Sequence, residues 1–172
     1  MNHNVSISEY EKLSSNELLE LASSEFHSAT RDTLATVCVQ LDTAHKCDEN
    51  DEETEFALTI LKRLSVKFEE HVGKEERLLF PLLSITQRKR NDAKEMKDVS
   101  EFIDDLKEEH NWVKHQFALI RKATNDYQCG IDSFPSQKLA YAHLNNLEQD
   151  FNRSFFVEEH YIFPRILRDY QH

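Results

Sequence analysis

Apolar side chains recur at intervals of three or four residues in four long stretches of the chain. This spacing is typical of amphipathic helices, because it places the apolar groups on one face of a helix with about 3.6 residues per turn. Ser14 and Glu17 have the spacing of a capping box at the start of the first stretch. The pattern predicts helices over about residues 15–46, 52–87, 95–127 and 136–169.

Long helices joined by short turns predict an all-α protein, namely an antiparallel up-down-up-down four-helix bundle. The 172 residues include two Gly and three Pro, too few for the many turns of an all-β fold. We expect residues 14–172 to form this bundle as one domain, and the polar, aperiodic residues 1–13 to form a flexible N-terminal arm. Pro81 and Pro164 fall late in their helices and should kink or loosen the last turns.

Polar side chains interrupt the apolar face of each predicted helix. His27 and His110 take inward positions in the first and third helices. Buried polar groups persist in a core only when they are paired or bind a metal. In the second helix the inward face comprises Phe56, Ile60, Leu64, Phe68, His71, Glu75, Leu78 and Leu82, and in the fourth it ends with Phe151, Ser154, Glu158, Tyr161 and Arg165.

A count from the turns places these polar residues at one height in the bundle. In antiparallel helices, residues equally distant from a turn lie side by side. Glu75 and Glu158 follow one helical turn later, roughly 6 Å along the axis. The equidistant pairs are His27 with His71, each 22 residues from residue 49, and His110 with Ser154, each 22 residues from residue 132.

Three imidazoles and two carboxylates that meet in a bundle interior predict a site for a pair of transition-metal ions. Carboxylates can bridge two metals, and imidazoles can fill the terminal positions. Two buried carboxylates would otherwise repel each other, and metal cations relieve that cost. Nitrogen and oxygen donors without thiolate favour iron or manganese, and iron is the first choice.

The segment 68–81 has a diluted second copy at 151–164, offset by 83 residues. The same offset carries His27 onto His110, but it carries His71 onto Ser154. The second copy therefore lacks one imidazole that the first copy has.

Three short motifs add to this picture: His71-x3-Glu75-Glu76-x2-Leu79-Phe80-Pro81, His27-x3-Arg31-x2-Leu34 and Glu109-His110. Together they resemble the signatures of the hemerythrin-like (HHE cation-binding) domains, over about residues 15–170. Among these domains, the chain looks most similar to the iron-sulfur cluster repair proteins. The resemblance implies a non-haem di-iron centre in which Glu75 and Glu158 bridge, with His27, His71 and His110 as the other ligands.

The chain departs from the family's second signature at Ser154, where that signature has His. The departure leaves the occupancy of the second iron open. Asp150 and Tyr161 are the nearest substitutes for the missing ligand, and a water molecule held by Ser154 is the alternative. Metal-bound imidazoles usually donate their other nitrogen to a carboxylate. The expected orienting carboxylates are Glu25, Glu70 and Glu108.

The formal net charge of −11 argues against nucleic acid or an anionic membrane as a partner. No stretch has the roughly 18 consecutive apolar residues of a membrane span, and no leader pattern opens the chain. We therefore expect a cytoplasmic protein.

The predicted function is binding or sensing of O2 or NO, or iron handling in oxidative or nitrosative stress, including iron-sulfur cluster repair. The sequence favours a binding protein over an enzyme. Two alternatives remain open: a di-iron oxidase or peroxidase, and a metal-poor helical bundle that serves as an interaction scaffold. A homodimer is compatible with all three.

Overall fold

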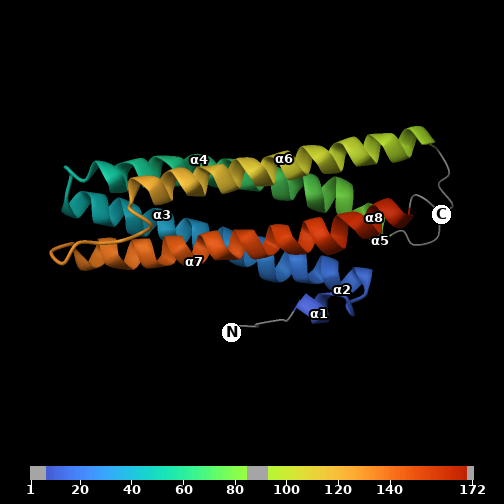
Figure 1. The fold of residues 1–172 in the computed structure, drawn as a ribbon, viewed down its shortest axis with the longest axis horizontal. Coiled ribbons are helices and arrows are strands. Elements are labelled where there is room, and N and C mark those ends of the chain that lie inside the picture. The colour runs from blue at the N-terminus through green and yellow to red at the C-terminus, as the bar shows by residue number, and fades with distance from the viewer. Residues whose placement is uncertain (1–6, 85–92, 170–172) are drawn as a thin grey trace.

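The computed structural model describes residues 7–84 and 93–169. These residues form an antiparallel four-helix bundle with no strand among them, which confirms the predicted fold (Figure 1). The first long segment comprises α2 (Ser15–Glu20), the π-helical η1 (Leu21–Ser28) and α3 (Ala29–Cys47). The second comprises α4 (Glu52–Lys74), the π-helical η2 (Glu75–Leu79) and α5 (Phe80–Ser84). The third is α6 (Ala93–Ala123), and the fourth comprises α7 (Pro135–Val157), the π-helical η3 (Glu158–Ile162) and α8 (Phe163–Asp169).

The ends of the helices lie within a few residues of the predicted ones, with one larger difference. The third helix ends at Ala123 and not near residue 127, because Asn125, Asp126 and Tyr127 have left-handed backbone angles with φ of 47°, 55° and 62°. A residue with left-handed backbone angles cannot continue a right-handed α-helix. The predicted residues 85–87 of the second helix lie outside the described residues.

Within the predicted N-terminal arm, two of the described residues, Tyr10 and Leu13, contact the bundle. Helix α1 (Ile7–Tyr10) buries Tyr10, whose ring lies 5.7 Å from that of Tyr161. The guanidinium of Arg165 donates a hydrogen bond of 2.6 Å to the carbonyl oxygen of Leu13. The Ser14–Glu17 capping box that opens α2 is present as predicted.

The π-helical turns η2 and η3 end two residues before Pro81 and Pro164. Proline lacks an amide hydrogen, and its ring collides with the carbonyl four residues earlier, so the preceding turn widens. The wider turn holds one extra residue, and the buried face shifts by one position beyond it. Leu79 is buried where Leu78 was predicted, and Ile162 and Ile166 are buried where Tyr161 and Arg165 were predicted.

The predicted burial of Phe56 is wrong for a different reason: Phe56 is 43% exposed, while its neighbour Ala57 is buried. The predicted face runs from Phe68 back to Phe56 in intervals of four residues. Three such steps rotate the position by about 120° around the helix, which carries Phe56 off the buried face.

The core consists of two apolar clusters. One surrounds Leu61, Leu64, Phe117 and Phe151, toward the end of the bundle that holds the α3–α4 and α6–α7 turns. The other surrounds Leu18, Leu79, Ile103, Phe163 and Ile166, toward the opposite end. The polar residues of the predicted layer lie between these clusters along α4 and α7.

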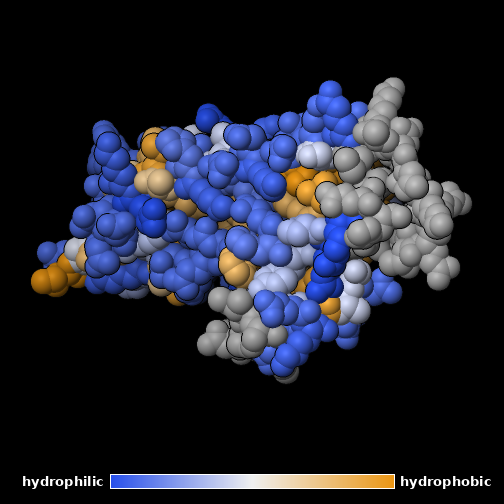
Figure 2. Space-filling view, turned by 45° about the vertical axis from the view of Figure 1, so that its right-hand side comes forward, coloured by the Kyte–Doolittle hydropathy of each residue, from blue (hydrophilic) through white to orange (hydrophobic). Residues whose placement is uncertain are grey.

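The outer face drawn in Figure 2 is mainly hydrophilic, with small separate hydrophobic patches. This agrees with a charged-residue content of 31%. Among the described helices, none combines the length and the apolar composition that a membrane crossing requires.

Candidate metal centre

Each of the three π-helical segments carries a residue of the predicted site. His27 lies in η1, Glu75 is the first residue of η2, and Glu158 is the first residue of η3. A π-helical turn re-aims side chains relative to a regular helix, and such turns are frequent at functional sites. Two of the three turns follow from the prolines, so the same local sequence that widens the helix also sets the direction of a carboxylate.

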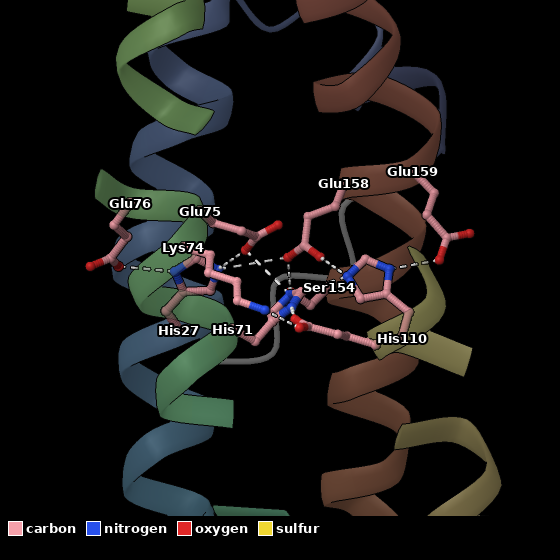
Figure 3. A network of polar contacts seen from close by, with 10 residues as sticks. His27, His71, Lys74, Glu75, Glu76, His110, Ser154, Glu158 and Glu159 are labelled. Atoms are coloured by element: carbon pink, nitrogen blue, oxygen red, sulfur yellow. Dashed lines mark hydrogen bonds and ion pairs between the residues drawn. The ribbon is translucent and has the colours of Figure 1, made fainter. Parts of the chain in front are cut away.

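The structure brings all five predicted residues together in the bundle interior, each at most 6% exposed. Figure 3 shows the carboxylates of Glu75 and Glu158 facing one another between the imidazoles. The Nε2 atom of His27 lies 3.1 Å from Glu75 Oε2 and 3.7 Å from Glu158 Oε1. Nε2 of His110 lies 3.1 Å from Glu158 Oε2, and Nε2 of His71 lies 3.6 Å from Glu75 Oε2.

The two sides of the site differ. On one side, Nε2 of His71 and Nε2 of His110 are 3.2 Å apart. Ligand atoms of these two residues and of Glu75 and Glu158 all lie within 4.8 Å of one another, a group that could hold a metal ion. On the other side, His27 is the imidazole that faces the two carboxylates.

Ser154 contributes a hydroxyl on this second side. It donates a hydrogen bond of 2.6 Å to Glu158 Oε1. Neither suggested substitute joins the cluster: Asp150 is exposed, and the ring of Tyr161 packs against Tyr10. The structure therefore favours Ser154 itself, and not another protein ligand, as the group at this position.

Several buried polar atoms of the site make no hydrogen bond within the described part of the chain. They are Nε2 of His27, both carboxylate oxygens of Glu75, and Oε2 of Glu158. His27 and Glu75 approach to 3.1 Å, but not with the geometry of a hydrogen bond. Leaving such groups without partners costs about 1–3 kcal/mol each. Converging nitrogen and oxygen lone pairs are the donor set of a transition-metal ion, and a bound cation would satisfy all of these atoms at once.

A comparison with protein families matches residues 24–166 to the hemerythrin HHE cation binding domain. The chain belongs to this family. The match spans His27 through Glu158 and confirms the resemblance read from the motifs. A search among curated proteins finds no match. Family membership and the buried cluster together indicate a cation-binding protein.

In this HHE domain, each of the three imidazoles of the candidate centre has a carboxylate at its second nitrogen. With Nδ1 donating, each Nε2 presents its lone pair to the interior of the site. The Nδ1 atoms of His27, His71 and His110 lie 2.9 Å, 2.9 Å and 2.7 Å from carboxylate oxygens of Glu76, Glu109 and Glu159, respectively.

The expectation that Glu25, Glu70 and Glu108 orient the imidazoles is therefore wrong. Glu70 instead pairs with Lys67 at 2.7 Å. The sequence did hold a signal, because Glu76 and Glu159 directly follow the inner carboxylates and coincide in the 83-residue repeat. Neighbouring helical positions point about 100° apart, so the second Glu of each doublet faces the adjacent helix and not the site.

Lysines also contact two of these carboxylates. Lys74 contacts Glu109, and Nζ of Lys114 lies 3.3 Å from Glu159. The hydrogen bond from His71, together with Lys74, outweighs partial burial and lowers the pKa of Glu109 to about 2. Glu109 is therefore ionised at neutral pH and acts as an acceptor for the imidazole.

The electrostatics of the HHE centre favour positive charge. Burial alone would lower the pKa of His27, but the attraction of the nearby Glu158 and Glu75 carboxylates outweighs it and raises that pKa to about 10. Glu158 and Glu159 likewise overcome burial and raise the pKa of His110 to about 9. Burial would raise the pKa of Glu158, yet His110 and His27 hold it well below its usual value. In the absence of metal, these shifts favour protonated His27 and His110 beside an ionised Glu158.

Proposed function

We propose that this HHE domain is a non-haem di-iron protein in which His27, His71, His110, Glu75 and Glu158 hold the metal. The observation that supports it is the convergence of buried nitrogen and oxygen atoms that lack hydrogen-bond partners. Imidazoles and carboxylates without thiolate suit iron. The carboxylates of Glu75 and Glu158 lie between the imidazoles, which supports a role for both in holding two ions.

We further propose that the centre binds a small diatomic molecule, O2 or NO, as a sensor or in iron handling under oxidative or nitrosative stress. Iron, when bound, supplies a redox-active position for such a ligand. The side of the centre with His27 and Ser154 has one imidazole, so it offers fewer protein donors and an open position. Apolar clusters flank the layer above and below.

Residues around the centre have defined tasks in this proposal. Glu76, Glu109 and Glu159 fix the orientation and tautomer of the imidazoles and increase their basicity. Ser154 holds one oxygen of Glu158 in place and leaves the other directed to His110. The bundle thus supplies a preformed set of donors, and little rearrangement is needed when metal enters.

Metal analysis of the protein as isolated, combined with its optical spectrum, tests the proposal. About two irons per chain with bands of a carboxylate- or oxo-bridged pair would support it. Titration of the reduced protein with NO should then change the spectrum at a stoichiometry set by the iron content. A protein without iron, whose melting temperature is unchanged by a chelator, would instead support an interaction scaffold. Catalytic turnover with peroxide would support the di-iron oxidase or peroxidase.

A further inference from the structure

A cavity of about 270 Å³ lies beside the candidate metal centre, between α4, α6 and α7. It borders the side of the centre that carries two imidazoles, and not the side of His27. Its apolar walls are Phe68, Trp112, Val113, Phe151 and Phe155, and its inner end is formed by His71 and His110.

The inner end of this cavity is less polar than its residue types suggest. Nδ1 of His71 is engaged by Glu109, and Nδ1 of His110 by Glu159. Both Nε2 atoms face the carboxylates of the centre. The ring of Phe155 stacks on that of His110, with centroids 3.9 Å apart and an angle of 15° between the planes. The imidazoles therefore present mainly ring carbon to the cavity.

Among the described residues that line the cavity, Lys67 is the cationic side chain. Lys67 is paired with Glu70 at 2.7 Å, and Glu109 is paired with His71 and Lys74. Glu108 adds an exposed carboxylate. An anionic molecule would have to compete with Glu70 for Lys67 and would be repelled by the net charge of −11. The rim and the walls therefore favour a neutral occupant.

The size of the cavity sets the size of that occupant. A cavity of about 150 Å³ with apolar walls accommodates benzene. The volume of about 270 Å³ has room for a molecule of one or two rings, and a diatomic molecule would leave most of it empty. Binding of such a molecule is favourable because it removes apolar surface from water.

We propose that this cavity is a binding site for a neutral apolar molecule of one to two rings, held directly against His71 and His110. Binding itself does not need the metal. Only its consequence, a ligand that borders the metal and changes its surroundings, rests on the proposed di-iron function. If the centre holds iron, the domain senses or transforms an apolar compound and not a diatomic gas alone.

Titration of the metal-free protein with fluorobenzene, followed by ¹⁹F NMR, tests the site directly. Trp112 is the single tryptophan of the chain and lines the cavity, so its fluorescence provides a second readout. We expect saturable binding that changes Trp112 emission. We expect 4-fluorobenzoate and 4-fluorobenzylamine, which are charged at neutral pH, to bind at least about tenfold more weakly, because the walls cannot compensate a charge. Tighter binding of either charged probe, or no saturable binding of fluorobenzene, would overturn the proposal.

Variants that fill the cavity locate the bound molecule. Val113→Phe should weaken fluorobenzene binding at least about tenfold, and Val113→Ile, which adds one methylene and is less disruptive to the core, should weaken it severalfold. Val39→Phe is the matched control, because Val39 is 67% exposed on α3 and does not line the cavity. Unchanged binding in both Val113 variants would overturn the assignment to this cavity.

The iron-loaded protein separates this inference from the proposed function. If both hold, fluorobenzene shifts the optical bands of the iron and does not change the iron content. Fluorobenzene binding by a protein that never acquires iron would support the cavity site and overturn the di-iron function. Iron loading without fluorobenzene binding would do the reverse.

Discussion

The hydroxyl of Ser154 donates a hydrogen bond of 2.6 Å to Oε1 of Glu158, one turn further along the same helix. This bond makes the two oxygens of Glu158 unequal. Oε1 is held by Ser154 on the side of His27, and Oε2 remains directed toward His110. The centre is therefore asymmetric: one side has two imidazoles, and the other has one imidazole and one hydroxyl.

Ser154→His should repair this asymmetry. The new imidazole adds a donor on the side of His27, and we expect the more weakly held metal to be lost at least about tenfold more slowly to a competing chelator. Ser154→Ala is the control, since it removes the hydrogen bond to Glu158 without adding a donor. Metal content measured by mass spectrometry during the chelator challenge checks the prediction. Equal loss rates in wild type and Ser154→His would show that this position does not limit metal retention.

His71→Ala should abolish binding of at least one metal. Its Nε2 lies next to both His110 and Glu75, so its loss opens the side of the centre with two imidazoles. We expect the metal content to fall by about one ion per chain or more. His115→Ala is the matched control, because His115 is exposed on α6 and outside the cluster. The assignment of His71 as a ligand would be untenable if its variant kept the metal content of the control.

Glu109→Gln tests the outer carboxylates. Glu109 accepts from Nδ1 of His71 and is held by Lys74, and it is ionised at neutral pH. The neutral amide keeps the shape but removes the charge that orients the imidazole and increases its basicity. Metal affinity should fall about 10–100-fold. Glu108→Gln removes the neighbouring exposed carboxylate and should leave the affinity unchanged. Competition with a coloured chelator measures both, and an equal effect of the two variants would contradict the role given to Glu109.

The height of the candidate ligand layer in the bundle could be predicted from the sequence for a physical reason. Counted from the turns, the chain reaches His71 and Ser154 through the regular α-helices α4 and α7, and the π-helical turns begin only at Glu75 and Glu158. Regular helices keep equidistant residues at equal heights. Beyond the widened turns the count fails, which is why Leu78 was wrongly placed in the core.

The orienting carboxylates could not be found by the same count. Glu109 reaches His71 from another helix, and the pairing depends on how two side chains meet across the bundle. A periodic pattern within one helix carries no information on this. The cavity beside Trp112 likewise arises from the packing of three helices, and no motif in any one of them predicts it.

The metal-free protein should be most stable in mildly acidic solution. His27 and His110 have pKa values of about 10 and about 9 in the folded state, above the ordinary 6.5. Protonated imidazoles therefore stabilise the fold fully below pH 6.5, and this contribution is lost as the pH rises through about 9 and 10. The pKa values of Glu109 and Glu158 are lowered, so their contribution is present above the ordinary 4.5 and is lost as the pH falls.

Denaturant unfolding of the metal-free protein at pH 5.5, 7.5 and 9.5 checks this expectation. The free energy of unfolding should decline across the series, and His27→Gln should be destabilised at pH 5.5 but show a shallower decline. Thiols and tyrosines with raised pKa values also cost stability at high pH, but they are shared by both proteins and cancel in the difference. Metal affinity should increase with pH, whereas the free energy of unfolding declines, because a cation must displace the imidazole protons. Parallel pH profiles for wild type and His27→Gln would mean that His27 carries no proton in the folded, metal-free centre.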